Sequence, residues 1–547
     1  MADNTAVPAA RTTDAKRSLM LLFSGLMLTM LLSSLNQTVL GTALPTMVGE
    51  LHGVDQMLWV ITAFILASTI AMPVYGKMGD LVGRKGLLII AIILFMAGSV
   101  VGGLAENMTW LIVGRAIQGL GGGGLIILAQ AIVADVVPAR ERGRYMGVMG
   151  GVFAFSSVAG PLLGGWFTEG PGWRWAFWIN LPLGALALLA AVFLLRLPRT
   201  AGIRPRIDYP GMALLSVGTT CLVLVSTWGG SEYAWTSPLI LGMIALTVVT
   251  GFAFVYVERR AAEPIMPLHL FRDRNFNLTT TAGLIIGVAM FGTIAYLPTY
   301  LQMVTGASAA VSGLLMVPMM GALLLTAIVS GQYVSRTGRY KWLTVAGPIV
   351  VGGATVALST MEPDTSIWLI CGYIAVMGAG LGPSMQLLVL IVQNSFPLRE
   401  VGTATAANNY FRQIGATLGS GMVGSVFATR LTGLLAERLP ANPAGAGAGA
   451  ADSFTPAAVN ALPDPLKEPI IASYNDALMP IFVVLAPLVV VAALLLAFIV
   501  EKPLATTLER GGPDEPPARP PAHVGVGGGS VEGAPGVVGE PVPASRP

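Results

Sequence analysis

Two arginines of this 547-residue chain lie where a charge is unexpected, inside long apolar runs. Arg115 falls a few residues into one run, with Gln118 one helical turn further on, and Arg412 stands beside Gln413 in another. A charge at membrane depth costs on the order of 3 kcal/mol or more and usually marks a pathway for substrates or ions. These four side chains are therefore candidates for lining a polar cavity.

Both arginines also have a structural interpretation. Trp110 lies just before Arg115, and tryptophan is typical of the membrane interface, so the guanidinium could extend to the lipid headgroups instead. Arg412 could bond to neighbouring helix ends without touching a substrate. The sequence leaves these alternatives open.

The chain offers little for enzymatic chemistry. Its three histidines, His52, His269 and His523, have no ligand-like spacing, and no nucleophile–base pair is visible. Cys221 and Cys371 both lie in apolar runs, which leaves neither a disulfide framework nor a metal site. No P-loop occurs, so ATP is not the expected energy source. We expect no cofactor, no metal and no nucleic-acid partner, and a membrane enzyme is a weaker alternative.

An internal repeat points to two homologous halves. The segment GKMGDLVGRK at 76–85 returns in outline as GQYVSRTGRY at 331–340, and PARERG at 138–143 returns as PLREVG at 397–402. In the first pair, the corresponding residues are Gly76 and Gly331, Gly83 and Gly338, and Arg84 and Arg339. Short charged loops that recur in the same order between apolar runs indicate a transporter built from parallel repeats.

The repeated loops predict a gate. Gly76 and Gly83 permit a tight turn and close approach of helices, while Arg84 holds the cytoplasmic edge. Asp80, which Ser335 replaces in the second copy, can face the positive N-terminus of a helix in the opposite half, or an arginine. That contact would exist while the cytoplasmic side is shut and break when it opens. The alternative is a loop that only sets topology.

Composition indicates a membrane protein. Apolar residues make up 54% and charged residues 11% of the chain, and its mean hydropathy is +0.73. Runs of about 20 apolar residues suffice for helical spans. They occur fourteen times, at 19–43, 57–76, 87–105, 109–134, 144–167, 175–196, 209–228, 236–257, 276–303, 308–333, 342–361, 366–392, 403–429 and 477–500.

The distribution of charge predicts the orientation. With both termini in the cytoplasm, 25 of the 31 Lys and Arg residues fall in cytoplasmic loops or tails. The outward loops hold mainly acids, namely Glu50, Asp55, Glu106, Glu169, Glu232, Glu362 and Asp364. Arginine greatly outnumbers lysine, and Ala, Gly and Pro are abundant, as in a GC-rich bacterial genome. The expected location is thus a bacterial plasma membrane.

The fold class we predict is an all-α integral membrane protein with two parallel six-helix halves and two inserted helices. Its expected parts are a cytoplasmic tail at 1–18, the first half at 19–196, the inserted pair at 209–257 and the second half at 276–500. The second half includes a long outward loop at 431–475, and 503–547 forms a Pro- and Gly-rich disordered tail.

Several motifs carry a family resemblance. GKMGDLVGRK, RAIQGLGGGG at 115–124 and GGVFAFSSVAGPLLGG at 150–165 resemble three motifs of the major facilitator superfamily, the third in the form associated with antiporters. Four more resemble the fourteen-helix drug–proton antiporters of the EmrB/QacA type: LNQTVLGTALP at 35–45, WRWAFWINLP at 173–182, YLPTYLQMVTG at 296–306 and FRQIGATLGSG at 411–421. The resemblance covers roughly residues 19–430 and the last helix.

The resemblance implies roles for particular residues. Arg115 would link proton movement to the substrate cavity, and Asp135, at the cytoplasmic end of span 4, is the acid closest to the interior. The span 5 motif would act as hinge and seal at the boundary of the halves. Its small residues allow close helix packing and its proline allows a bend: Gly151, Gly160, Pro161, Gly164 and Gly165.

One position departs from the family pattern. Asn36 stands in span 1 where members usually carry an aspartate, and no Asp or Glu lies near the middle of any span. A cavity with arginine and amides but no carboxylate favours neutral, amphipathic or anionic substrates over dications.

The expected function is export of small amphipathic compounds by alternating access, driven by the proton gradient. The expected protein is a monomer whose partners are the lipid bilayer, its substrates and protons. The alternatives are export of a lipid or lipid-like substrate with unusual or absent proton coupling, and a non-transporting sensor. The sensor would not need both gating loops.

Overall fold

The chain folds into long helices, and a computed structural model describes residues 9–53, 56–195, 206–230, 232–439, 459 and 462–506. All of them belong to one unit, Met1–Leu508. The first half contains α1 (Ala9–Glu50), α2 (Met57–Val82), α3 (Arg84–Gly103), α4 (Met108–Val136), α5 (Ala139–Glu169), α6 (Trp175–Trp178) and α7 (Asn180–Phe193).

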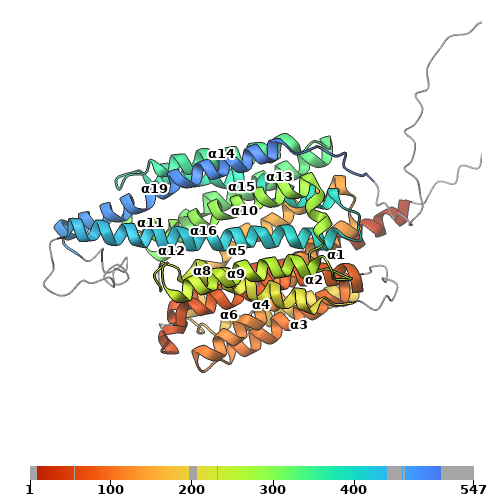
Figure 1. Ribbon diagram of the computed structural model, residues 1–547, viewed down its shortest axis with the longest axis horizontal. Helices are drawn as coiled ribbons and strands as arrows, with labels where there is room; N and C mark the ends of the chain where they lie inside the picture. Colours follow the sequence, from red (N-terminus) through yellow and green to blue (C-terminus); the bar gives the residue numbers. More distant parts are fainter. Residues whose placement is uncertain are drawn as a thin grey trace, which may run out of the picture. The chain divides into compact units, whose positions relative to one another are not determined.

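The remaining helices follow the same scheme, with two helices between the halves (Figure 1). The inserted pair is α8 (Tyr209–Trp228) and α9 (Pro238–Glu258). After a short 3-10 helix, η2 (Leu268–Arg272), the second half contains α10 (Arg274–Ile294), α11 (Leu297–Val304), α12 (Ala309–Leu315), α13 (Val317–Thr337), α14 (Lys341–Ser359), α15 (Ile367–Ser395), α16 (Val401–Arg438) and α19 (Asp464–Ala497).

Thirteen helical segments of the described chain are long and apolar enough to cross a membrane. The one predicted span outside this set, at 403–429, corresponds to α16, which has 38 residues but carries Asn408, Asn409 and Arg412. It can hold these side chains because it packs against α2, α4, α10 and α19. The all-α fold class predicted from the sequence is confirmed.

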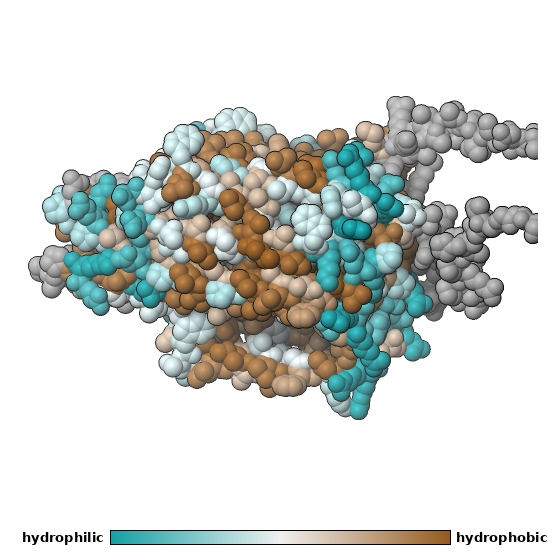
Figure 2. All heavy atoms as spheres, turned by 90° about the horizontal axis from the view of Figure 1, so that it is seen from above, coloured by the Kyte–Doolittle hydropathy of each residue, from teal (hydrophilic) through white to brown (hydrophobic). Residues whose placement is uncertain are grey.

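Polar residues gather at both ends of the helices and apolar residues form the belt between them, as one face of the molecule shows (Figure 2). We call the end that carries Gly83, Pro138, Gly338 and the 396–400 turn the inner end. The sequence predicts that this end faces the cytoplasm.

Local sequence sets several helix boundaries. Asp208, Ser237 and Asp273 each accept a hydrogen bond from a backbone N–H in the first turn of the helix that follows, which satisfies a donor that the helix leaves open. Gly83 (φ 96°) separates α2 from α3, and Gly338 (φ 75°) ends α13. Such positive φ angles favour glycine, so the second glycine of each repeated loop forms a tight turn, whereas the first lies within its helix.

Each half has largely its own apolar core. Buried side chains of α10 to α19 form one large cluster, and those of α1 to α7 form two others. A small cluster joins the halves through Met72 and Ile127 from the first and Ala406 from the second. The halves also pack closely through α5 on α13 and α2 on α16, so two separately packed bodies share an interface at which one can rock against the other.

The ends of the expected segments differ in places. α1 is already helical at Ala9, inside the tail expected at 1–18. The outward loop expected at 431–475 is shorter, because α16 continues to Arg438 and α19 begins at Asp464. An ion pair between Arg438 and Asp476 joins these extensions, which the hydropathy pattern does not reveal. The disordered tail expected at 503–547 lies outside the described residues beyond 506.

Candidate functional site

Asp80 and Arg84 form a corner between two helices at the inner end. Asp80 lies in the last turn of α2 and Arg84 begins α3, and Nη2 of Arg84 donates to Oδ1 of Asp80 at 2.7 Å. Nη1 of the same guanidinium donates to Oδ1 of Asp135, near the end of α4, and to the backbone oxygen of Ala131. One buried arginine thus joins three helices of the first half.

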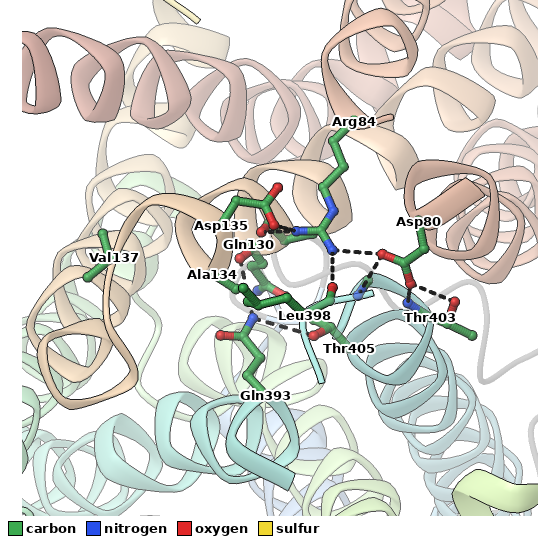
Figure 3. A network of polar contacts seen from close by, with 12 residues as sticks. Asp80, Arg84, Gln130, Ala134, Asp135, Val137, Gln393, Leu398, Thr403 and Thr405 are labelled. Carbon is green, nitrogen blue, oxygen red and sulfur yellow. Dashed lines mark hydrogen bonds and ion pairs between the residues drawn. The ribbon is translucent and has the colours of Figure 1, made fainter. Parts of the chain in front are cut away.

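Asp80 also reaches across to the second half. Its Oδ1 accepts from the backbone N–H of Gly402 at 3.1 Å, and its Oδ2 accepts from the N–H and the hydroxyl of Thr403 at 2.6 and 2.8 Å. These donors belong to the first turn of α16, where the helix dipole favours an anion. Arg84 adds a bond to the carbonyl of Leu398, so both members of the pair hold the opposite half (Figure 3). This is the kind of contact expected of Asp80.

Glycines let the helices of opposite halves cross closely at two places. A Cβ at Gly76 of α2 would lie 2.8 Å from the carbonyl oxygen of Gly402 in α16, and a Cβ at Gly143 of α5 would lie 3.0 Å from that of Gly331 in α13. Gly76 and Gly331 are repeat equivalents, as are Gly143 and Gly402. The first repeated loop of each half therefore packs on the second repeated loop of the other.

The two crossings differ in charge. Ser335 takes the place of Asp80, and its hydroxyl is buried without a partner among the described residues. Arg140 at the start of α5 instead donates to the carbonyls of Ser335 and Arg336 at 3.2 and 2.8 Å. Arg339, the counterpart of Arg84, is exposed, and within the described chain its side chain makes no recorded bond. The repeat predicted two gating loops, but only the first carries the acid–arginine cluster.

A layer of amides that the sequence analysis missed lies next to this cluster (Figure 3). Nε2 of Gln393 in α15 donates to the carbonyl of Gln130 in α4 at 3.3 Å, and Nδ2 of Asn409 in α16 donates to Oε1 of Gln130 at 3.0 Å. All three side chains are buried, and they again join the two halves. Their only signal was the presence of amides within apolar runs.

A connection from the inserted helices also touches both halves. Glu263 pairs with Lys77 of α2 at 2.7 Å, and Nε2 of His269 lies 2.9 Å from an oxygen of Glu400, directly before α16. A cavity of about 710 Å³ beside the gate is lined by these four residues and by Asp80. We call residues 259–273 the inner strap.

Arg115 is enclosed within the first half. Its guanidinium donates to the carbonyl of Val60 at 3.1 Å, to Oδ1 of Asn36 at 2.7 Å and to Oε1 of Gln118 at 2.9 Å, and it lies 4.2 Å from the ring centroid of Phe64. Only 3% of the residue is exposed, so Arg115 does not extend to the headgroups. Nδ2 of Asn36 is buried without a partner in the described chain.

The structure does not bring the four expected cavity residues together in one bonded cluster. Asn36 and Gln118 are fully buried and bond to Arg115. Arg412 and Gln413 are half-buried in α16, where Nη2 of Arg412 donates to Oδ1 of Asn409 at 2.6 Å. Asp135, expected near the coupling machinery, belongs to the inner cluster of Arg84.

The glycine motif of α5 serves two surfaces. A Cβ at Gly160 or Gly164 would clash with Thr38 or Thr42 of α1, so these glycines pack within their own half. Gly151 faces Leu324 of α13. The boundary with the second half is formed mainly by the earlier glycines of the helix, and helix α5 continues through Pro161 without a break.

Gly165, the last member of the motif, faces open space, with no atom within 4 Å of an added Cβ. It contributes neither to the packing on α1 nor to the boundary.

Two repeated helical halves that meet at a charged gate are the architecture of a membrane transporter, and the comparisons agree. The sequence matches the profile of the Major Facilitator Superfamily over residues 26–420, and the chain therefore belongs to that superfamily. It is a multi-pass membrane transporter and not an enzyme.

Several relatives are similar along most of their length. An uncharacterized MFS-type transporter of Mycobacterium tuberculosis is 40% identical over 88% of this chain and 70% of its own. The multidrug transporter protein MdtP of Bacillus subtilis is 37% identical over 78% of both chains. Multidrug resistance protein 3 of Bacillus subtilis is 32% identical over 91% of this chain and 98% of its own.

Solved structures share the fold. The human organic anion transporter MFSD10 superposes with a TM-score of 0.58 at 15% identity, covering 88% of this chain and 99% of its own. The proton:xylose symporter XylE gives a TM-score of 0.55 at 15% identity over 88% and 95%. At this identity the likeness concerns the fold alone.

Proposed function

We propose that this protein exports small amphipathic molecules by alternating access, driven by the proton gradient. It acts as a monomer in a bacterial plasma membrane, with both termini in the cytoplasm. The observation that carries the proposal is the bonding of Asp80 to the first turn of α16, which ties the halves together at the inner end. The names of the two multidrug relatives of Bacillus subtilis support efflux as the direction.

The inner gate is a device with two states. Its bonds form only when α2 and α16 are in contact, so opening the inner end must break the Asp80 contacts and separate Gly76 from Gly402. Water would then replace these contacts and hydrate both the first turn of α16 and the carboxylate of Asp80. The gate can therefore be opened by any event that weakens the acid–arginine cluster.

Protons are proposed to act on this cluster. Asp80 and Asp135 share the guanidinium of Arg84, and no described acid lies near the middle of a span. A proton on either carboxylate replaces an ion pair with a weaker contact and loosens the gate. Arg115 supplies the buried link from α4 to α1 that would transmit the change to the outer part of the first half.

The test is substrate-dependent proton movement in proteoliposomes. Full-length protein is reconstituted, a pH gradient is imposed, and uptake of a fluorescent amphipathic compound is followed together with the pH inside the vesicles. Export coupled to protons requires that each flux depends on the other. Substrate flux that ignores the pH gradient would contradict coupling, and the absence of any flux would contradict transport of these compounds.

A groove on the side of the bundle favours lipid-like substrates as the second candidate. It measures about 420 Å³ and is lined almost wholly by apolar side chains of α1, α5 and α13, including Met27, Phe155 and Leu324. Phe155 and Val148 at its rim are exposed, so a lipophilic molecule could enter from the bilayer. Transfer of a fluorescent lipid between leaflets of the same vesicles would favour this candidate.

A further inference from the structure

The interior charge of the bundle is entirely positive in the described chain. Arg115 and Arg412 lie well inside their helices, whereas the acids Asp80, Asp135 and Glu258 lie within the last turn of α2, near the end of α4 and at the end of α9. A guanidinium in the membrane interior is costly unless acceptors or an anion surround it. Each of the two guanidinium groups therefore needs hydrogen-bond acceptors or an anion around it.

The protein itself supplies the acceptors for Arg115. Three oxygen acceptors and the face of Phe64 surround its guanidinium, and the residue is almost completely enclosed. These contacts leave no room for a ligand to approach the charge directly. Arg115 is a positioning residue between α4 and α1.

Arg412 has fewer acceptors around its guanidinium than Arg115 has. A guanidinium has five N–H donors, and the one hydrogen bond recorded for this side chain in the described structure goes to the neutral amide of Asn409. Arg412 is only half-buried although it lies eleven residues into α16. On the other side, α10 packs on its backbone, since a Cβ at Gly287 would lie 2.5 Å from its carbonyl oxygen. The remaining donors make no recorded bond in the described chain and are not fully enclosed.

Neighbouring residues complete a polar surface. Asn409 lies three residues before Arg412 and four residues before Gln413, so its side chain neighbours both of them on α16. Asn409 is fixed by Gln130 of α4 and by the carbonyl of Thr405, which orients its oxygen toward the arginine. A planar guanidinium held in this way can bind the two oxygens of a carboxylate side by side.

We propose that Arg412, supported by Asn409 and Gln413, is an anion subsite that binds the acidic group of an amphipathic substrate. The inference rests on the proposed export of amphipathic compounds and narrows their class to anions with one acidic group. The same chemistry would bind a free inorganic anion such as chloride, which would then neutralise the cavity for an uncharged substrate.

The test compares three fluorescent probes that share a scaffold: dansylglycine (anionic), dansylamide (neutral) and dansylcadaverine (cationic). Each is titrated into the purified full-length protein at low ionic strength, in a chloride-free buffer whose counter-ion is a bulky sulfonate instead of a carboxylate. The variants are Arg412→Gln, Arg412→Lys and, as a control on the same helix, Arg430→Gln. Arg430 is exposed and donates to the backbone of Asp476.

Binding of dansylglycine should exceed that of dansylcadaverine, and Arg412→Gln should weaken it about tenfold or more while dansylamide changes little. Arg412→Lys should retain most of the preference for the anion, and Arg430→Gln should retain all of it. Thermal melting shows whether Arg412→Gln is folded, and the Lys variant keeps the comparison valid if it is not.

The two sources of the anion are separated by chloride. If the subsite holds the substrate's own carboxylate, chloride competes with dansylglycine and leaves dansylamide unaffected. If it holds a free anion, chloride strengthens the binding of dansylamide. Either result supports the subsite, provided that Arg412→Gln abolishes the chloride effect.

Binding without charge preference, or equal weakening of all three probes by Arg412→Gln, would overturn the subsite. Since binding is measured without a gradient, this outcome is distinct from failure of the proposed export. Vesicles that transport none of the probes would instead contradict the export while the subsite stands.

Discussion

Nη1 of Arg115 donates a hydrogen bond of 2.7 Å to Oδ1 of Asn36, which joins α4 to α1 inside the first half. The amide that replaces the usual aspartate of the family is thus the neutral partner of the buried arginine. Nδ2 of Asn36 is buried and has no hydrogen-bond partner in the described chain. The pair sets the charge of this region at plus one.

Arg115→Ala removes the donor for three acceptors, and two of them, Oδ1 of Asn36 and Oε1 of Gln118, are buried side-chain oxygens. We expect a loss of about 2–4 kcal/mol in the free energy of unfolding and little transport at matched protein level. Thermal melts and vesicle transport measure the two effects. Near-normal transport would show that the link from α4 to α1 is dispensable.

Asn36→Asp should pair with Arg115 and remove the positive charge of this region. Export of dansylcadaverine should rise relative to dansylglycine, by about tenfold at most, since the arginine partly neutralises the new carboxylate. Asn36→Ala is the control, because it removes the amide without adding charge and should leave the ratio near that of the parent. If both variants give the same ratio, span 1 does not set the charge preference.

Asp80→Asn should favour the state that is open at the inner end. An amide oxygen cannot replace two carboxylate oxygens that accept four hydrogen bonds from Arg84, Gly402 and Thr403, and we expect a shift of about 1–3 kcal/mol. The measurement is maleimide labelling of Thr405→Cys, a fully buried position, after replacing both native cysteines with serine.

Asp135→Asn is the matched control for that experiment. Asp135 bonds to Arg84 but makes no recorded bond to the second half within the described chain, so its loss should raise the labelling less. Equal labelling in both variants would show that the contact with α16 is not what holds the gate.

Gly331→Ala should disturb the second crossing. The new Cβ would clash with the backbone of Gly143, which cannot move without shifting α5, at a cost of about 1–3 kcal/mol. Gly321→Ala on the same helix meets nothing within 4 Å and should behave like the parent. Labelling of Thr405→Cys and transport compare the two, and similar values for both would argue against a close crossing in the transport cycle.

The inner strap should contribute modestly to the shut state. The Lys77–Glu263 pair is partly exposed, with side-chain exposures of 14% and 40%, so Glu263→Gln is expected to cost about 0.2–1 kcal/mol. The double exchange Lys77→Glu with Glu263→Lys should restore the parent's labelling of Thr405→Cys. Failure of the exchange to restore it, after each single change had raised it, would mean that the charges act separately.

The sequence alone determined the class of protein and most of the helices. Apolar runs of the length of a bilayer can only be helices, because the backbone must satisfy its hydrogen bonds within each span. The repeated loops showed two halves, and the carboxylate of Asp80 at a helix end already required a cation or a helix N-terminus nearby. These conclusions depend on local composition and on order along the chain.

Tertiary structure decided which residues meet. Only the packing of the halves shows that Gly76 lies on Gly402 while Gly331 lies on Gly143, that Gln130 joins Gln393 and Asn409 across the boundary, and that Arg115 is satisfied whereas Arg412 is open. These pairs are separated by up to several hundred residues, and their contacts depend on side-chain directions and on helix crossings that hydropathy does not encode. The same residue type in two apolar runs therefore has different surroundings, because one is enclosed with three acceptors and the other is partly exposed with one.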